Sequence, residues 1–585
     1  MKFLLTAINA KYIHSNPGVY SLKQYAEHVS FGEYGINIEI AEYTINHPVS
    51  RILQDVYRRR PDAIGFSCYI WNVAYVWELV HDLHKILPDT DIWLGGPEVS
   101  FDARQILERE PEILGVMKGE GEAAFAGLLA GYRLLDSSVQ RWRQRRLQEK
   151  RAEPGTDEGD AFWKKLHRLY GVAFRGEDGG IQDNASCAAE TLSQIPFPYS
   201  DLAGLEHRII YYESSRGCPF SCSYCLSSID KSVRFRELGL VQRELDFFLD
   251  RRVPQVKFVD RTFNCKKEHA MAIWQYIWEH DNGVTNFHFE VAADRLDEEE
   301  LELLGKMRPG LVQLEIGVQS TNPDTIREIR RQMDLVRLRK AVQRINRGHN
   351  IHQHLDLIAG LPFEGYESFH RSFNEVYEME PEQLQLGFLK VLKGSYMYEM
   401  AEKYDLVYQE KPPYEVLSTR WISYEELCRL KGIEAMVEVY YNSGQFIHTL
   451  GRLMQELPDP FAFYEQLAQY YEEQGLNERS HNRLARYEIL HDFIRERFGD
   501  RGEQWQEQLE DALVFDCYLR ENCKSRPGFA LDLAPYKDKL KRLAPEVRKL
   551  GMQIHVEVLR SGEIWLFDYR NRDPLTWNAS VMRLN

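Results

Sequence analysis

The sequence has no uninterrupted apolar run approaching 18 residues, and it is poor in cysteine, with nine in 585 residues. The first absence argues against a membrane-spanning helix, and the second argues against a disulfide framework. The first residues include a short apolar run but no small-residue cleavage site, so we interpret them as a strand rather than a signal peptide. These features predict a cytoplasmic protein with no membrane partner.

The sequence also lacks an excess of positive charge. It has 73 Lys and Arg against 89 Asp and Glu, a net charge of −16, so it offers no global footprint for duplex nucleic acid. One local exception is the stretch 141–151, with six Lys or Arg in eleven positions. We interpret it as a solvated helix before an exposed linker, and a patch for RNA is the alternative. Nucleic acid is therefore not an expected partner.

Residues 1–130 alternate apolar strands with helical stretches. The strand-like runs lie at 2–8, 36–43, 63–69, 91–96 and 113–119. Continuous apolar runs fit a parallel sheet that is covered on both faces. We therefore predict an α/β protein that begins with a doubly wound, Rossmann-like domain, followed at 131–200 by a charged helical linker.

A second series of strands and helices occupies residues 201–404. Its predicted strands lie at 208–214, 255–260, 286–292, 312–318, 354–360 and 384–390. Six such units predict a partial (β/α)6 barrel, whose active site lies at the C-terminal ends of the strands. Residues 405–585 turn helical, and the last 35 residues contain two strand-like runs about a Gly turn, which predicts a terminal β-hairpin.

Three cysteines follow the first predicted barrel strand in the stretch SRGCPFSCSYC: Cys218, Cys222 and Cys225. Thiolates suit an iron–sulfur cluster or zinc. A structural zinc site would need a fourth Cys or His, and no nearby residue completes it. Three thiolates on a four-iron cluster would instead leave one iron open for substrate. Unrelated buried cysteines are the remaining alternative.

The pattern C-x-x-x-C-x-aromatic-C, with Tyr224 before the last cysteine, resembles the radical S-adenosylmethionine (radical SAM) superfamily. The resemblance implies a [4Fe–4S] cluster on the three cysteines and S-adenosylmethionine on the fourth iron. It also implies reductive cleavage of S-adenosylmethionine, and hence an electron donor such as flavodoxin or ferredoxin.

The same resemblance implies a set of residues that bind S-adenosylmethionine at the ends of barrel strands. They are Tyr224, Asp260, Glu290, Glu315, Gln319 and Gly360. An alternative holds for the acidic members, because carboxylates at strand ends often cap a helix or pair with an arginine.

The first domain resembles the cobalamin-binding domain that precedes some radical SAM barrels. The matching residues lie at the C-terminal ends of its predicted strands, where open α/β sheets bind ligands: Ser67, Gly95, Gly96, Pro97, Gly119, Glu120 and Gly121. Glycines there would let the backbone approach a flat macrocycle. The alternative is that these glycines only make tight turns.

The first domain also departs from this pattern. Cobalamin domains with a histidine ligand to cobalt carry D-x-H-x-x-G after the first strand. Here Tyr12 replaces the Asp, and Gly18 lies one position too late. His14 is the candidate cobalt ligand, but it lacks the carboxylate that would orient its ring. Loss of the corrinoid, leaving a structural domain, is the alternative.

We therefore predict a radical SAM enzyme that catalyses cobalamin-dependent methyl transfer to an unactivated centre of an unknown substrate. A rearrangement or cyclisation without methyl transfer is the alternative. An RNA methylthiotransferase would need three cluster cysteines in its first domain, where only Cys68 occurs. A non-catalytic iron–sulfur redox protein is a further alternative. In the helical extension, Cys517 and Cys523 raise the hypothesis of an auxiliary cluster, but only Cys428 remains there to complete it.

Overall fold

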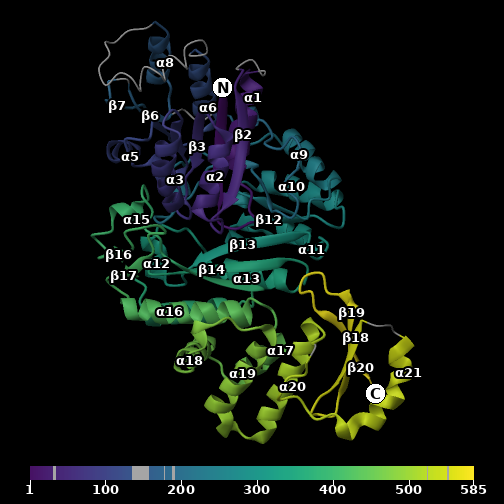
Figure 1. The fold of residues 1–585 in the computed structure, drawn as a ribbon. Coiled ribbons are helices and arrows are strands. Elements are labelled where there is room, and N and C mark those ends of the chain that lie inside the picture. The colour runs from purple at the N-terminus through teal and green to yellow at the C-terminus, as the bar shows by residue number, and fades with distance from the viewer. Residues whose placement is uncertain are drawn as a thin grey trace. The chain divides into compact units, whose positions relative to one another are not determined.

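The computed structural model describes residues 1–30, 35–134, 157–176, 178–186, 191–523, 525–549 and 553–584. The chain folds as two compact units (Figure 1). The first comprises Met1–Phe289, Lys390–Lys403 and Tyr408–Val416, and the second comprises Glu290–Leu389, Tyr404–Val407 and Leu417–Asn585. The basic stretch 141–151 lies outside the described residues.

The first unit opens with a seven-stranded sheet of order β2-β1-β3-β4-β5-β6-β7. Its strands are β1 (Lys2–Asn9), β2 (Asn37–Thr44), β3 (Ala63–Ser67), β4 (Asp91–Gly95), β5 (Gly115–Met117), β6 (Val172–Arg175) and β7 (Ile181–Asp183). The first five are parallel, with Phe3 opposite both Ile38 and Ala63. The last two are antiparallel, and their residues come from the segment predicted as a linker.

Helices cover both faces of this sheet, because the buried strands are apolar on both sides. Along β1, Phe3 and Leu5 pack into one core cluster and Leu4 and Ile8 into the other. The first cluster includes residues of α1 (Pro17–Ser30), α6 (Glu122–Arg133) and α8 (Asp157–His167). The second includes residues of α2 (Val49–Arg59), α3 (Val73–Ile86) and α5 (Ala103–Arg109); the short α4 is Pro97–Ser100. The predicted doubly wound α/β domain is confirmed.

The first unit continues into the predicted barrel. Parallel strands β8 (Ile210–Tyr212), β11 (Gln255–Phe258) and β12 (Asn286–Val291) lie in the order β12-β11-β8, and the last two residues of β12 belong to the second unit. The short strands β9 (Ser215–Arg216) and β10 (Arg234–Phe235) form an antiparallel pair after β8. Helices α9 (Leu238–Asp250) and α10 (Lys267–Glu279) follow β10 and β11 along the chain. Segment 390–403, with α15 (Tyr396–Glu399), also belongs to this unit.

The second unit holds the later barrel strands. β13 (Val312–Gln319), β14 (His352–Ala359) and β15 (Gln383–Phe388) are parallel neighbours, with Leu355 opposite Ile316 and Leu384. Their helices are α11 (Glu298–Gly305), α12 (Pro323–Glu328), α13 (Leu335–Asn346) and α14 (Tyr366–Tyr377). All six predicted strands are thus present, and among the described residues they do not close into a complete barrel.

The rest of the second unit is mainly helical, as predicted. Its helices are α16 (Tyr424–Met436), α17 (Ile447–Glu456), α18 (Pro460–Glu473), α19 (Arg483–Phe498), α20 (Glu503–Arg520) and α21 (Lys537–Lys549). The predicted hairpin is β18 (Ile554–Val558) and β19 (Ile564–Arg572), and β20 (Ala579–Leu584) adds a third antiparallel strand. None of the helices in the described ranges has the length and apolar character needed to cross a bilayer.

Candidate functional site

The three cysteines lie on the segment that follows β8, residues 213–228, which we call the cysteine loop. Its first turn depends on Gly217, whose φ is +99°. A Cβ at this position would lie 2.3 Å from the carbonyl oxygen of Ser232, so only glycine fits the close backbone approach. The pairing of β9 with β10 holds the two segments together on either side of this contact.

Backbone hydrogen bonds shape the rest of the cysteine loop. The Cys225 amide donates to the Cys222 carbonyl at 3.2 Å, and the Ser228 hydroxyl donates to the Cys225 carbonyl at 2.6 Å. The amide of Met397, in α15, donates to the Ser223 carbonyl at 2.8 Å. The loop therefore has a defined path that its own backbone supports.

The three thiols differ in exposure. Cys218 and Cys222 are buried and Cys225 is half-buried. Among the described residues, the three sulfur atoms do not all lie within 4.8 Å of one another. One tetrahedral zinc ion with Zn–S bonds of about 2.3 Å would bring them to about 3.8 Å. The wider arrangement favours a group larger than a single ion, such as an iron–sulfur cluster.

Asp260, just after β11, anchors the start of this loop. Its Oδ1 accepts hydrogen bonds from the hydroxyls of Ser214 (2.6 Å) and Ser215 (2.7 Å), and its Oδ2 accepts from the Ser214 amide (2.9 Å). Burial raises the pKa of Asp260 to about 7, although these hydrogen bonds favour the charged form. The predicted role of Asp260 in binding S-adenosylmethionine stays a prediction, and the structure adds this anchoring role.

A cavity of about 900 Å³ in the first unit connects the two sets of predicted residues. The ends of β3, β4 and β5 contribute all the predicted cobalamin residues except His14: Ser67, Gly95, Gly96, Pro97, Gly119, Glu120 and Gly121. Tyr224 and Cys225 of the cysteine loop line the same cavity. The carboxyl ends of parallel strands are where open α/β sheets bind ligands.

Two glycines in the loops after β4 and β5 have backbone conformations that other residues rarely adopt. Gly96 has φ +108°, and a Cβ there would lie 2.5 Å from the Cys68 carbonyl oxygen, so this glycine serves the packing of two loops. Gly119 has φ +67°, lines the cavity, and a Cβ there would meet no protein atom within 4 Å. An open, glycine-lined wall fits a bulky flat ligand that approaches the backbone.

An ion-pair network joins the Gly119 loop to the cysteine loop. Arg216 Nη2 donates to Glu122 (2.9 Å) and Glu213 (2.7 Å), and Arg216 Nη1 lies 3.0 Å from a Glu120 carboxylate oxygen. Arg234 also pairs with Glu120. Burial alone would raise the pKa of Glu122, but Arg216 outweighs it and holds that pKa below its ordinary value. The two candidate cofactor loops are therefore electrostatically coupled.

Aromatic and late-chain residues complete the cavity wall. The rings of Tyr69 and Trp71 stack at 4.3 Å, and both line the cavity. Lys393 reaches it from segment 390–403 and forms an ion pair of 2.7 Å with Asp102. Glu98 is buried beside Lys393, and burial raises its pKa. The cavity thus combines flat apolar surface with a few charged groups, as cofactor sites do.

His14 does not line this cavity. Its Nδ1 lies 2.6 Å from the Tyr211 hydroxyl, and burial together with Lys11 and Lys257 lowers its pKa. The structure therefore gives His14 a hydrogen-bonded position beside β8. Its predicted role as a cobalt ligand is not supported by this arrangement and stays a prediction.

The remaining predicted residues lie in the second unit. Glu290 lies in β12, Glu315 and Gln319 lie in β13, and Gly360 follows β14 with φ +86°. Gln319 has φ +73° at an irregularity of the strand, and within the described chain its buried Oε1 has no hydrogen-bond partner. Strained backbone and an unpaired buried polar atom are typical of functional positions. Both observations suit a ligand contact at Gln319.

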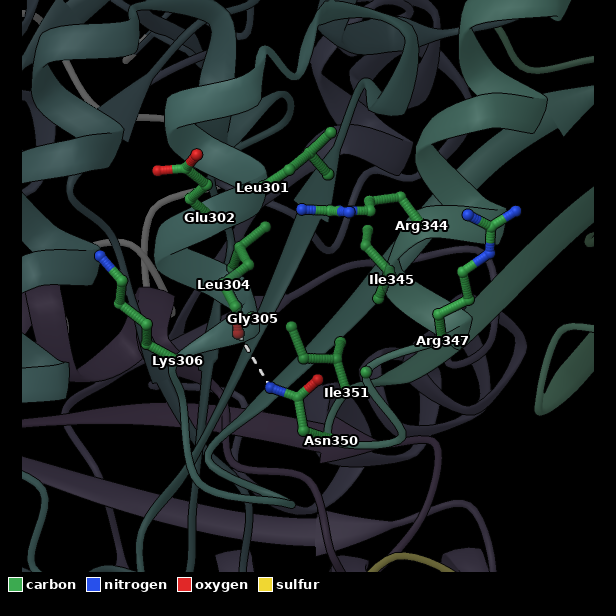
Figure 2. Close-up of a pocket in the computed structure, with 11 residues that line it drawn as sticks. Leu301, Glu302, Leu304, Gly305, Lys306, Arg344, Ile345, Arg347, Asn350 and Ile351 are labelled. Carbon is green, nitrogen blue, oxygen red and sulfur yellow. Dashed lines mark hydrogen bonds between the residues drawn. The ribbon is translucent and has the colours of Figure 1, made fainter.

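A smaller hollow of about 370 Å³ in the second unit contains none of the predicted site residues. Figure 2 shows it between α11 and α13, with Lys306, Arg344 and Arg347 at its rim. The Asn350 side chain donates to the Leu304 carbonyl at 2.9 Å and closes one end. These are the side chains of a solvated rim, and we assign them no role.

Three segments of the chain match known protein families. Residues 4–129 match the B12 binding domain, and residues 212–376 match the Radical SAM superfamily. The chain carries a B12-binding domain and a radical SAM domain. Residues 402–559, which include α16 to α20, match a family described as a protein of unknown function, DUF4080.

Two methyltransferases are among the proteins to which this chain is similar. The chain is 26% identical over 381 residues to the cobalamin-dependent radical SAM methyltransferase TokK of Streptomyces tokunonensis, covering 60% of this chain and 51% of TokK. It is 23% identical to 2-(S-pantetheinyl)-carbapenam-3-carboxylate methyltransferase of Streptantibioticus cattleyicolor, covering 74% and 65% of the two chains. The chain thus matches between half and two thirds of the length of these relatives.

A solved structure supports the fold. The cobalamin-dependent S-adenosylmethionine radical enzyme OxsB, with aqua-cobalamin and S-adenosylmethionine bound, superposes with a TM-score of 0.57 at 14% identity. The match covers 93% of this chain and 81% of OxsB. At this identity the likeness shows the fold alone.

Sequence reasoning missed the residues that connect the two domains. Arg216 precedes the first cysteine by two positions, yet its partners Glu120 and Glu122 lie about a hundred residues earlier. Lys393 reaches the cavity from the other end of the domain. The acidic residues of KGEGEAAF (118–125) could have predicted an arginine or lysine partner, because buried carboxylates require a cationic partner.

Proposed function

We propose that this protein is a radical SAM enzyme that uses a corrinoid to transfer a methyl group to an unactivated centre of a small-molecule substrate. The observation that carries the proposal is the shared cavity. Gly119 and its neighbours from the B12-binding domain and Cys225 from the radical SAM domain line one space of about 900 Å³. Two cofactors that must act together need such a common space.

The residues present fit both groups. Cys218, Cys222 and Cys225 would hold the [4Fe–4S] cluster, and the glycine-rich ends of β3, β4 and β5 would hold the corrinoid. The open space beside Gly119 supports the second assignment. When bound, the cluster supplies the electron that cleaves S-adenosylmethionine, and the corrinoid carries the methyl group.

The residues of the chain fix the positions of the two proposed cofactor-binding segments and form the cavity wall. Arg216 ties the Gly119 loop to the cysteine loop through Glu120 and Glu122, which fixes the two cofactor-binding segments against each other. Asp260 fixes the start of the cysteine loop through Ser214 and Ser215. The stacked rings of Tyr69 and Trp71 give one wall of the cavity an apolar surface.

One alternative function is disfavoured by burial. An RNA methylthiotransferase would need cluster cysteines in its first domain, but Cys68 is fully buried between β3 and the helices of the second core cluster. Burial also raises the pKa of its thiol far above the ordinary value. The electron donor and the methyl acceptor remain predictions of chemical class.

The proposal is tested by anaerobic purification from cells supplied with hydroxocobalamin, followed by corrinoid and iron assays and a visible spectrum. We expect about one corrinoid and one [4Fe–4S] cluster per chain. Adding S-adenosylmethionine and a chemical reductant should then consume S-adenosylmethionine. A protein with a cluster that cleaves S-adenosylmethionine but binds no corrinoid would overturn methyl transfer and favour rearrangement chemistry.

A further inference from the structure

The second unit contains a pair of cysteines in contact. Cys517 lies near the end of α20 and is fully buried, and Cys523 lies just beyond the helix and is half-buried. Their sulfur atoms are 3.1 Å apart. We call these two residues the dithiol. The cysteine loop has a different arrangement, because its three sulfurs do not converge to this degree.

An arginine from the neighbouring helix holds the dithiol. Arg483, the first residue of α19, donates from Nη2 to the Cys523 sulfur at 3.2 Å and to the Cys517 carbonyl at 2.6 Å. Its Nε lies 2.9 Å from a Glu521 carboxylate oxygen. The Arg483 side chain is only 18% exposed. One guanidinium therefore orients both ends of the short segment that joins the two cysteines.

The charges around the pair distinguish the two thiols. The hydrogen bond from Cys517, followed by Arg483, lowers the pKa of Cys523 to about 6 against the effects of burial and Glu521. The same hydrogen bond and burial raise the pKa of Cys517. The other titratable groups that interact with the dithiol or with Arg483 are Tyr487 of α19, Tyr518 and Arg520 of α20, and Tyr569 of β19.

A metal does not account for this arrangement. Within the described ranges, no third His, Cys, Asp or Glu brings a ligand atom within 4.8 Å of both sulfurs. A permanent cation, Arg483, contacts the half-buried sulfur directly. An iron–sulfur or zinc site would need more thiolate or imidazole ligands and no competing guanidinium. The auxiliary-cluster hypothesis therefore has no support from the ligands present.

We propose that Cys517 and Cys523 form a redox-active dithiol that reacts with a disulfide of a small thiol or of a thiol–disulfide exchange protein. The half-buried Cys523 thiolate attacks one sulfur of the disulfide RSSR, forms a mixed disulfide, and releases RS⁻. Cys517 then loses its proton and attacks the Cys523 sulfur, which releases the second RS⁻. The two RS⁻ ions take up the proton that Cys517 loses and the one that Cys523 lost when it ionised. The dithiol thus loses two electrons, and RSSR becomes two RSH.

The geometry suits this order of events. Cys523 is the less buried of the two cysteines and its sulfur accepts a hydrogen bond from Arg483, which makes it the first nucleophile. Cys517 is buried but already touches Cys523, so closing the disulfide requires the sulfurs to move from 3.1 Å to about 2.05 Å. The reaction uses none of the residues around the cofactor cavity, so it stands independently of the proposed methyl transfer.

The test uses the full-length protein under anaerobic conditions with oxidised glutathione as the probe. Peptide mass spectrometry should show a disulfide between Cys517 and Cys523 that dithiothreitol reverses. In the Cys517→Ser variant, glutathione should remain attached to Cys523, because the second attack is lost. In the Cys523→Ser variant, Cys517 should not react. A Cys517→Ser variant without an adduct, or a wild-type protein that keeps a stable adduct, would overturn the proposal.

A second measurement distinguishes activation by Arg483 from simple proximity. We compare the rates at which iodoacetamide alkylates Cys523 and Cys428, a cysteine that is exposed on α16. The comparison is made in the wild-type, Cys517→Ser and Arg483→Met proteins. At pH 6 wild-type Cys523 should react roughly tenfold faster than an ordinary exposed thiol, since its larger thiolate fraction outweighs its lower nucleophilicity. Arg483→Met should remove part of this advantage, because Arg483 is one of the two groups that lower the pKa of Cys523, and Arg483→Lys should restore some of it. Equal rates at Cys523 and Cys428 would contradict an activated thiolate.

Discussion

The cysteine loop and the dithiol each contain cysteines and a half-buried arginine, yet the two regions are built in different ways. In the cysteine loop the three sulfurs do not all lie within 4.8 Å of one another, and Arg216 binds carboxylates. In the dithiol the sulfurs touch, and Arg483 binds one of them. The spacing of the sulfurs indicates a different function for each region. A wide arrangement leaves room for a bound group, and a close one suits a covalent bond between the cysteines.

The largest expected difference between the regions is in iron content. Replacing Cys218, Cys222 and Cys225 together by Ala should abolish the brown colour, the bound iron and all cleavage of S-adenosylmethionine, since these three thiolates are the proposed ligands of the cluster. The double variant Cys517→Ser/Cys523→Ser should keep them all. Iron assay, visible spectrum and the yield of cleaved S-adenosylmethionine check both outcomes. Residual cleavage in the triple variant would contradict the cluster assignment.

The two arginines should also differ in their effect on stability. Arg216→Met leaves the buried Glu122 carboxylate without its partner, and we expect a loss of about 3–5 kcal/mol. Arg483→Met removes hydrogen bonds to sulfur and to a carbonyl, but its carboxylate partner Glu521 is 59% exposed, so the loss should be about 1 kcal/mol. The midpoints of urea unfolding measure both losses.

A matched variant separates charge from packing in that experiment. Adding Glu122→Gln to Arg216→Met removes the unpaired charge, so the double variant should recover part of the lost stability. Similar losses for Arg216→Met and Arg483→Met would show that the contrast between the two regions is not electrostatic.

The cysteine loop should also respond to pH through its anchor. The pKa of Asp260 is about 7 in the folded protein against about 3.9 in an unfolded chain. The folded state therefore binds more protons between these values, and stability should fall as pH rises from about 4 to 7. Glu364 acts in the same direction, because burial raises its pKa to about 7. Urea midpoints against pH should show a smaller slope in Asp260→Asn, and an unchanged slope would exclude this anchor as the cause.

The sequence predicted those parts of the site that are local in the chain. The spacing of Cys218, Cys222 and Cys225 and the glycines at strand ends are short patterns, and the structure brings Cys225 and the glycines to one cavity. The five apolar runs of residues 1–130 likewise predicted a parallel sheet, because both faces of each strand are buried.

Other features depend on contacts between distant residues and could not be predicted. Arg216 meets Glu122 across 94 positions, and Arg483 meets Cys523 across 40. The strands β6 and β7 were missed because the charged run 141–151 suggested a linker, whereas Val172 to Phe174 pair with the edge of the first sheet. Short strands carry little signal against a polar background.

The smallest expected effect on stability is that of replacing either of two glycines that both have a positive φ. Gly119, in the cavity wall, has φ +67°, and Gly562, in the hairpin between β18 and β19, has φ +81°. A Cβ at either position would meet no protein atom within 4 Å, so Gly→Ala should cost about 1 kcal/mol at both because of the positive φ alone. Only Gly119 lines the cavity. Gly119→Ala should therefore weaken binding of hydroxocobalamin at least tenfold, a loss of about 1.4 kcal/mol, while Gly562→Ala leaves it unchanged. Equal corrinoid affinity in the two variants would show that this wall does not contact the corrinoid, and the open space beside Gly119 would then belong to another ligand.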